Sequence, residues 1–363
     1  MVESQQPEIL TTKVDPSHIP GRGGATLQHL SSSDTHHTLL LLFGASRVEN
    51  LDDIWLVHIN RGTQKVEYAE RVAARERDGL TTRNSMGSLR LGDGKVLLVG
   101  GQDSEKGIVF NDIFTYEHAT RQFAHVEYGT GKVTPSARNS HTLSHTEGSQ
   151  YAYLFGGADN ENGPKRDLYR LNLSTLEFNV IKLEVPDTVK FPYLEMHTAH
   201  LYKGNTKLLI LGGRGYYPGE SIEQSNFHNQ IFEIDIEEGS ATYGHVSEIG
   251  TLPADLGSHQ SALIDDKYIV IYGGCNGLRF FDSILRYSLE DKKWTLMTKQ
   301  PANAKGSRFF QDGRISLSST LCLPDLLVFF GGTSVEKECN DWLILPIDHL
   351  RDDKNFSEIN EIM

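Results

Sequence analysis

The sequence predicts an all-β protein made of six similar antiparallel sheets. Three observations support this fold class: a recurring apolar run that ends in glycine, two companion segments that keep step with it, and no helical periodicity through nearly all of the chain. The runs are LLLLFGA, VLLVGG, YAYLFGG, LLILGG, YIVIYGG and LLVFFGG. Their first glycines follow at intervals of 56, 56, 56, 61 and 58 residues, and are Gly44, Gly100, Gly156, Gly212, Gly273 and Gly331. Six runs at so regular an interval indicate an internal repeat.

Each apolar run has a short segment of β-type composition on either side. A polar-then-apolar strand follows the runs, at residues 51–59, 110–117, 166–173, 228–236, 281–289 and 340–347. The preceding segment is clear in five units, at residues 83–89, 137–143, 196–201, 257–263 and 314–320. An aromatic residue often lies a few residues after the polar-then-apolar strand, as at Phe123, Phe178 and Trp294. Each unit is therefore expected to be a four-stranded antiparallel sheet of about 50 residues, the size of one β-propeller blade.

These residues resemble the kelch-repeat family, in which a glycine pair ends the second strand of each blade and an aromatic residue follows. The resemblance covers about residues 20–347 and implies a six-bladed, kelch-type β-propeller of four-stranded blades. Blade 1 departs from the pattern, with Gly44-Ala45 in place of a glycine pair, and the later aromatic is often Phe or Tyr. Residues 1–19 are then an N-terminal tail, and residues 348–363 a C-terminal tail.

A closed propeller must join its last blade to its first, and two segments could supply the closing strand. EILTTKV (8–14) precedes the first repeat just as KKWTLM (292–297) precedes the last. NFSEINEIM (355–363) could instead complete blade 6 from its own end. We favour the N-terminal segment, because closure by a distant terminus removes exposed sheet edges.

Composition excludes several classes of function. With 35 basic and 48 acidic residues the net charge is −13, which argues against direct nucleic-acid binding and against anionic membranes. Cys275, Cys322 and Cys339 are too few for a disulfide framework and lack the spacing of a structural zinc site. Residues 1–20 show no signal peptide, and the apolar runs are too short to span a bilayer, so we expect a cytoplasmic protein.

The topology places the candidate binding residues on one rim of the propeller. In antiparallel blades, the loops after the glycine pairs and the residues that open each repeat converge on the same face. Arginines gathered there suit a carboxylate or acidic peptide, since the guanidinium group matches a carboxylate with two hydrogen bonds, and aromatic side chains add apolar contact. The predicted partner-binding residues are Arg83, Asn84, Arg138, Asn139, Arg214, Tyr216, Tyr217, Arg279, Phe280, Arg308 and Arg314, with Arg22 and Arg47 nearby.

Structural roles are the alternative for several of these residues. Arg83 and Arg138 could tie neighbouring blades together, and the Tyr216–Tyr217 pair could pack over the long loop that follows it. The histidines near the strand starts could approach a metal near the axis, but we expect them to be bonded to neighbouring backbone, because no HxH or HExxH spacing occurs. These histidines are His141, His197, His200 and His259.

The resemblance implies a non-enzymatic interaction module that needs no cofactor or metal. We expect a scaffold or adaptor that holds an acidic or C-terminal peptide segment of a partner protein on the Arg/Tyr rim. Two alternatives stay open: a substrate-recognition subunit of a ubiquitin ligase, and a propeller enzyme acting on a small sugar or similar molecule. The sequence contains no GxSxG nucleophile motif that would favour catalysis. It does not indicate an oligomeric state.

Overall fold

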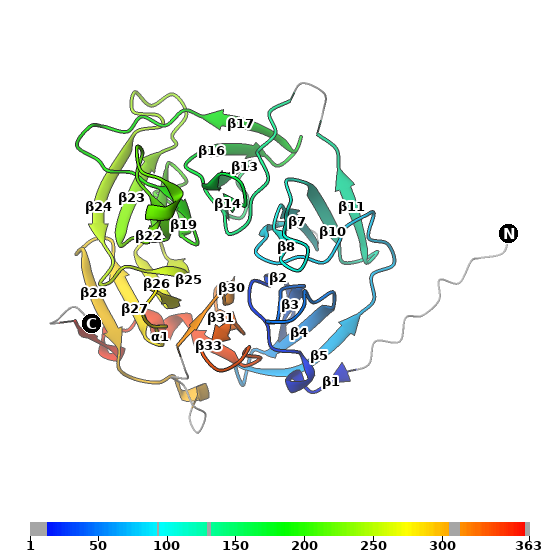
Figure 1. The fold of residues 1–363 in the computed structure, drawn as a ribbon. Helices are drawn as coiled ribbons and strands as arrows, with labels where there is room; N and C mark the ends of the chain where they lie inside the picture. Colours follow the sequence, from blue (N-terminus) through cyan, green and yellow to red (C-terminus); the bar gives the residue numbers. More distant parts are fainter. Residues whose placement is uncertain (1–12, 93, 129–131, 305–312, 360–363) are drawn as a thin grey trace.

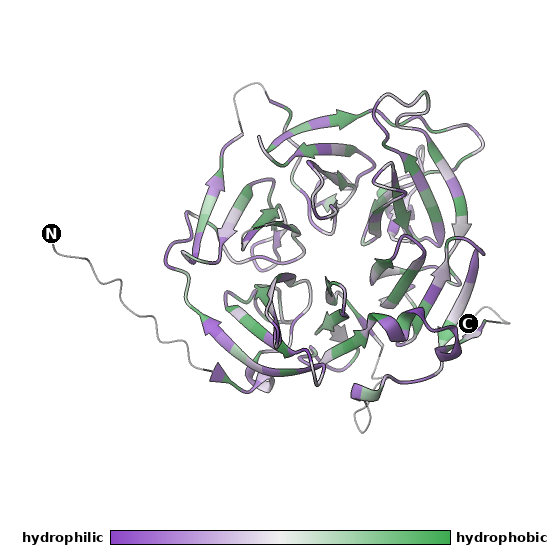
Figure 2. Ribbon diagram, turned by 180° about the vertical axis from the view of Figure 1, so that it is seen from behind, coloured by the Kyte–Doolittle hydropathy of each residue, from purple (hydrophilic) through white to green (hydrophobic). Residues whose placement is uncertain are grey.

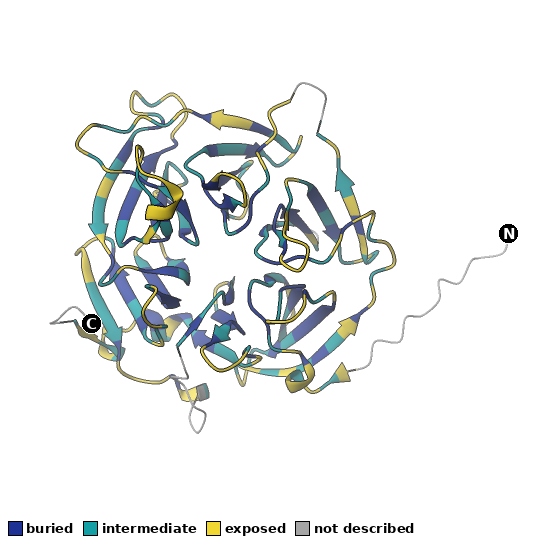
Figure 3. Cartoon of the chain, viewed as in Figure 1, coloured by how far each residue is buried: buried dark blue, intermediate teal, exposed yellow. Residues whose placement is uncertain are grey.

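The computed structural model describes residues 13–92, 94–128, 132–304 and 313–359. It is an all-β propeller, in which six main sheets stand around a common centre (Figure 1). The second strand of each blade is mostly buried, the strand nearest the axis is partly buried, and the outer strands and loops carry most of the exposed residues (Figure 3). Among the described residues, no helix has the length and apolar character that crossing a membrane would require.

The first three blades have four strands each, ordered from the axis outwards. Blade 1 contains β2 (Thr26–Ser32), β3 (His36–Leu42), β4 (Ile54–Asn60) and β5 (Lys65–Val72). Blade 2 contains β6 (Gly87–Gly92), β7 (Lys95–Val99), β10 (Ile113–Glu117) and β11 (Gln122–Val126). Blade 3 contains β12 (Thr142–Ser144), β13 (Tyr151–Phe155), β16 (Leu168–Asn172) and β17 (Glu177–Ile181).

The last three blades follow the same order, but blade 6 is smaller. Blade 4 contains β19 (Thr198–Tyr202), β20 (Lys207–Leu211), β23 (Gln230–Asp235) and β24 (Val246–Thr251). Blade 5 contains β25 (Gly257–Ile264), β26 (Tyr268–Cys275), β27 (Ile284–Ser288) and β28 (Lys293–Met297). Blade 6 contains β30 (Ser318–Cys322), β31 (Leu326–Phe330) and β33 (Trp342–Pro346).

Short elements decorate the loops between these strands. Those beside the second and third strands of the blades are β8 (Gln102–Asp103), β9 (Ile108–Val109), β14 (Ala158–Asp159), β15 (Gly163–Pro164), β21 (Arg214–Tyr216), β22 (Asn226–Phe227) and β32 (Thr333–Ser334). Two more precede the inner strands, β18 (Tyr193–Glu195) and β29 (Arg314–Ile315). The helical turns are η1 (Pro16–His18), η2 (Ile222–Gln224), η3 (Ala302–Ala304), α1 (Ile347–Arg351) and η4 (Asp353–Asn355).

The two chain ends do not close the propeller as expected. The described part of the predicted N-terminal strand, β1 (Lys13–Val14), pairs with β5 on the outer edge of blade 1, and residues 8–12 lie outside the described residues. The C-terminal strand β34 (Phe356–Glu358) pairs with β28 of blade 5. In the described part of the chain blade 6 therefore has three strands and not four. The physical reason is α1, whose Ile347 and Leu350 are buried in the apolar core shared by blades 5 and 6 and direct the chain towards blade 5.

A ring of backbone hydrogen bonds closes the propeller at its axis instead. One residue per blade, near the start of the inner strand, donates its N–H to the carbonyl of the equivalent residue in the preceding blade, over 2.8 to 3.1 Å. The first blade donates to the sixth, so the circle is complete. The axial ring consists of Gly24, Ser85, Ser140, Met196, Ser258 and Ser316, all with positive φ. In the described part of the chain, six blades surround one axis, and each contributes one residue to this ring.

Apolar cores fill the seams between adjacent blades. Each of the six buried clusters combines side chains of two neighbouring sheets: for example, Leu41 of blade 1 and Val328 of blade 6 belong to one cluster, and Leu154 of blade 3 and Val99 of blade 2 to another. Figure 2 shows the molecule from the opposite side, where hydrophobic residues recur along the strands and hydrophilic residues are concentrated in the loops. Burial between sheets therefore explains the apolar runs of the sequence.

The glycine pairs end the second strand in a left-handed conformation. In blade 4, Gly212 and Gly213 have φ of +57° and +105°. In blade 1 the equivalent left-handed residues are Phe43 and Gly44, with φ of +55° and +95°, and not Gly44 and Ala45. The hydrogen bonds support this alignment of the repeats. The N–H of Gly44 and the N–H of Gly213 each donate to an equivalent backbone carbonyl of the next blade. The apparent exception in blade 1 is a shift of one residue in the repeat.

Gly212→Ala should lower the free energy of unfolding by about 2–4 kcal/mol. A Cβ atom at Gly212 would lie 2.4 Å from the backbone oxygen of Leu256, which cannot move without disturbing blade 5. Gly219→Ala is the matched control, because Gly219 also has a positive φ, +94°, but no atom lies within 4 Å of its Cβ position. The control should lose only about 1 kcal/mol. Equal losses in urea unfolding would show that close approach is not the reason for this glycine.

Candidate functional site

A polar cavity of about 480 Å³ opens on one face of the propeller, outside the axial ring. We call this cavity the mouth. Two positions per blade line much of it: the residue before the axial ring, and the residue after the left-handed pair, which form an antiparallel bridge. In blades 1 to 4 these pairs are Gly23 and Ala45, Asn84 and Gln102, Asn139 and Ala158, and Glu195 and Arg214. The mouth is thus asymmetric, with small residues at blade 1, amides at blades 2 and 3, and charges at blade 4.

Arg214 and Glu195 form the ion pair at blade 4. Arg214 Nη1 donates to Glu195 Oε1 over 3.0 Å, and the Arg214 side chain is 40% exposed while that of Glu195 is 10% exposed. Burial raises the pKa of Glu195, and the neighbouring guanidinium group only partly opposes this. Among the described residues, the guanidinium group of Arg214 donates to Glu195 through Nη1. Because a guanidinium group has five N–H donors, others can reach a ligand in the mouth. Arg214 therefore lies at the mouth, and its role in partner binding stays a prediction.

Asn84 and Asn139 also line the mouth, but their side chains are buried and engaged. Asn84 Nδ2 donates to Asn50 Oδ1 over 2.8 Å and to Ser104 Oγ over 3.2 Å. Asn139 Nδ2 donates to the carbonyl of Ala158 over 3.2 Å. These bonds connect the walls of the mouth and hold the amides in place. Their role is to shape a polar surface more than to reach a ligand.

The arginines that open the repeats are not on the rim, and that prediction is wrong for Arg83, Arg138 and Arg314. Each is at most 3% exposed and binds an aspartate at the start of the third strand of its own blade. Arg138, for example, donates to Asp167 over 2.8 and 2.9 Å and to the carbonyl of Gly156 over 2.9 Å. The pairs are Arg22–Asp53, Arg83–Asp112, Arg138–Asp167 and Arg314–Asp341. They hold the first and third strands of a blade together.

The remaining predicted residues do not gather at the mouth either. Tyr216 stacks on Tyr193 with ring centroids 4.9 Å apart, and Tyr217 packs edge-on against His228 beside a separate pocket. Arg279 lies over the ring of Phe281, and Phe280 forms a backbone bridge with Cys275. These four residues stabilise loops. Arg308 lies outside the described residues.

The rim is consequently not a cationic surface. The charged residues that line the mouth, among those described, are Arg47, Arg214, Asp159, Glu195 and Glu338. Arg47 donates to the carbonyls of Ser334 and Val335 over 2.7 and 2.9 Å and pairs with Glu338, so it clamps the loops of blades 1 and 6 together. A surface with this charge balance gives no reason to expect a strongly acidic partner segment.

Exposed apolar side chains lie in the loops on the face that carries the mouth, and the sequence analysis missed them; of these, Ile222 lines the mouth itself. Five of the eight exposed large hydrophobic residues in the described chain lie in the loops between the second and third strands, on the same face. They are Val48, Ile108, Ile222, Leu278 and Val335, which we call the loop tips. Leu278 is 94% exposed and Val48 82% exposed. In the sequence, each loop tip is an apolar residue within a mostly polar loop, which could have indicated an exposed contact residue. Only the fold places the five loop tips on one face.

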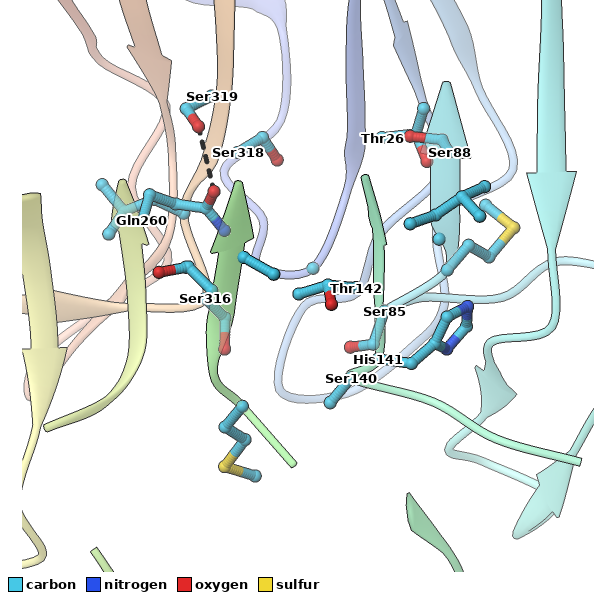
Figure 4. Close-up of a pocket in the computed structure, with 18 of the residues that line it drawn as sticks. Thr26, Ser85, Ser88, Ser140, His141, Thr142, Gln260, Ser316, Ser318 and Ser319 are labelled. Carbon is cyan, nitrogen blue, oxygen red and sulfur yellow. Dashed lines mark hydrogen bonds between the residues drawn. The ribbon is translucent and has the colours of Figure 1, made fainter. Parts of the chain in front are cut away.

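Below the axial ring, a second and smaller cavity of about 260 Å³, the channel, lies between the inner strands around the axis. Figure 4 shows its lining of small hydroxyl side chains, including Thr142, Ser316 and Ser318, with Ser319 donating to Gln260 over 2.9 Å. The buried histidines extend this network between blades: His197 Nε2 lies 3.1 Å from Thr142 Oγ1, and His259 Nε2 lies 2.9 Å from Thr198 Oγ1.

Burial lowers the pKa of the channel histidines. The pKa values of His141, His197 and His259 fall to about 3, and that of His200 to about 4. The imidazoles are therefore neutral at physiological pH. His197, His200 and His259 bond to hydroxyl groups of neighbouring blades. His197 also has the backbone contact that the sequence suggested, with Phe155 of blade 3.

Fold and site together define a kelch-type β-propeller with a polar mouth and with the apolar loop tips on the same face. The KLHDC2/KLHL20/DRC7 Kelch-repeats domain matches residues 85–312, more than half of the chain, and the protein belongs to that family. Kelch-repeat propellers are generally protein-interaction modules.

Curated relatives are similar to this chain over part of their length. Mouse multiple epidermal growth factor-like domains protein 8 is 26% identical over 69% of the chain, and the match spans 9% of that relative. Adagio-like protein 3 of Oryza sativa subsp. japonica is 26% identical over 76% of the chain and 41% of the relative. Host cell factor homolog hcf-1 of Caenorhabditis elegans is 28% identical over 65% of the chain and 30% of the relative. The chain spans less than half the length of each.

Proposed function

We propose that this protein is a non-enzymatic adaptor or scaffold of the cytoplasm that binds a segment of a partner protein across the mouth. The loop tips carry the proposal. Exposure of side chains as apolar as Leu278 and Val48 to water is unfavourable, and a partner segment that covers them would gain the free energy of their burial. Family membership supports the same class of function, since kelch-repeat propellers generally bind proteins.

The partner segment we propose is apolar, with one carboxylate. Its apolar side chains would cover the loop tips, and its carboxylate, at a C-terminus or on an acidic side chain, would bind Arg214. That guanidinium group is 40% exposed and lines the mouth beside a carboxylate whose pKa is raised by burial. A guanidinium group binds a carboxylate with paired hydrogen bonds, which favours one well-placed carboxylate over a general acidic character.

Charge placed at the loop tips should weaken binding to partner peptides at least tenfold. The experiment screens a peptide library with free and amidated C-termini, then measures Kd for selected peptides with wild type, Leu278→Asp and Val48→Asp. Aspartate at a tip removes apolar contact and leaves a charge to be desolvated. Val180→Asp is the matched control, because Val180 is 58% exposed but lies on the outer strand of blade 3. Equal losses in the control and in the tip variants would contradict a mouth-side interface.

Arg214→Glu tests the carboxylate. Free-acid peptides should lose at least tenfold in affinity, while amidated peptides without acidic side chains should change little. Lys293→Glu makes the same charge reversal on an exposed outer strand and should leave both Kd values unchanged. If the tip variants lose binding but Arg214→Glu does not, the partner is held by apolar contact alone.

A further inference from the structure

Two histidines and a cysteine meet at the seam between the first and last blades, at the end of the channel away from the mouth. His29 lies in β2, His37 in β3, and Cys322 is the last residue of β30. One ring nitrogen of each histidine and the Cys322 Sγ lie within 4.8 Å of one another. Among the described residues, this is the group of three histidine, cysteine or acidic side chains that comes together this closely. It is independent of the mouth.

The two imidazoles point ring nitrogens at the same place. Ser32 Oγ lies 3.0 Å from His29 Nε2 and 2.8 Å from His37 Nδ1, so these nitrogens converge on one small volume. The other nitrogen of His37, Nε2, lies 3.1 Å from Asp325 Oδ2. Nε2 donates a hydrogen bond to this carboxylate, so the lone pair of His37 lies on Nδ1, where it accepts from the Ser32 hydroxyl. A metal ion would take the place of that hydroxyl hydrogen bond. A carboxylate on the far nitrogen is the usual second partner of a metal-binding histidine.

The surrounding structure holds this group in position. Arg61 donates to Asp325 from Nε over 2.8 Å and pairs with it through Nη2 at 2.6 Å, so the carboxylate that orients His37 is itself anchored. The β2–β3 pairing has an irregularity between His29 and Ser31, and bulges of this kind redirect a side chain. Cys322 is fully buried, and its Sγ makes no hydrogen bond to the described residues.

We propose that His29, His37 and Cys322 bind one Zn²⁺ ion. Two imidazole nitrogens and one thiolate form a donor set that Zn²⁺ prefers, and water would complete a tetrahedral site. Binding forms the Zn–S bond as the thiol releases its proton to solvent, so no oxidant or reductant is required. The ion would join two strands of blade 1 to blade 6, the blade with three described strands. Its role would be to stabilise the closure of the propeller.

Metal binding is tested on the full chain stripped with a chelator and titrated with Zn²⁺ and Co²⁺. Wild type should take up one equivalent and gain several degrees in Tm with excess Zn²⁺, because the ion binds the folded state. Co²⁺ should give a thiolate charge-transfer band that reports a cysteine ligand directly. Cys322→Ser should abolish the band and reduce the Tm gain, and His29→Asn should weaken Zn²⁺ binding at least tenfold.

Cys275→Ser is the matched control, since Cys275 is another buried free cysteine and lies in blade 5. It should keep the cobalt band and the Tm gain. The wild-type titration decides the question even if a variant fails to fold: no cobalt–thiolate band and no Tm gain would overturn the proposal. A band that persists in Cys322→Ser, or that is lost in Cys275→Ser, would overturn it as well.

Discussion

Asp53→Ala should lower the free energy of unfolding by about 3–5 kcal/mol. Asp53 accepts hydrogen bonds from Arg22, which is 1% exposed, and from Trp55 Nε1 over 2.7 Å. Burial alone would raise the pKa of Asp53, but the hydrogen bonds and charge of Arg22 lower it overall, so the carboxylate is ionised in the folded protein. Alanine would leave a guanidinium charge buried without its counterion. Urea unfolding at neutral pH measures the loss.

The neighbouring residue supplies a control for this prediction. Asp52→Ala should change stability by less than about 1 kcal/mol, because the Asp52 side chain is 62% exposed and lies 3.6 Å from Arg77. The double variant Arg22→Met/Asp53→Leu should be more stable than Asp53→Ala, since it removes both charges and fills the space. If Asp53→Ala behaves like Asp52→Ala, the buried pairs are not what holds the first and third strands together.

Mild acid should destabilise the protein by several kcal/mol between pH 6.5 and 5. The pKa values of His141, His197 and His259 are lowered by burial to about 3 in the folded state, and that of His200 to about 4. Unfolded histidine titrates near pH 6.5. Below that pH the unfolded chain binds more protons, so the stability present above pH 6.5 is lost as pH falls towards 3. Over this range, each of these histidines lowers the free energy of unfolding by about 1 kcal/mol for each pH unit of acidification.

The measurement is the urea midpoint from pH 7.5 to 5 at constant ionic strength. His259→Gln should make the midpoint less sensitive to pH, because one titrating group is removed while an amide can still bond to Thr198. A midpoint that stays constant down to pH 5 would mean that these imidazoles reach water in the folded state.

The repeat of the fold was visible in the sequence, but its closure was not. Apolar runs and left-handed turns are local requirements, so runs such as LLILGG predict strand and turn directly. The axial ring depends on one backbone group from each blade, and backbone hydrogen bonds leave no mark in the sequence. The same holds for α1, a five-residue helix whose burial turns the chain towards blade 5 and leaves blade 6 with three described strands.

The candidate site was only partly predictable. The face of the mouth and the place of Arg214 follow from strand direction. Whether an arginine is a free cation depends on a partner that is distant in sequence: Arg138 meets Asp167, 29 residues away, and is buried. The zinc ligands we propose are more distant still, because His29 and Cys322 belong to the first and last repeats and match no short spacing motif.

By itself, then, the amino-acid order specified the β class, the repeat and the face on which its loops converge, because each of these depends on neighbours a few residues apart. The tertiary structure alone decided which charges are neutralised, which apolar side chains remain in water, and which residues of the first and last blades meet. Those properties arise from burial and from contacts across the ring, and the free energy of an ion or an apolar group is set by those surroundings.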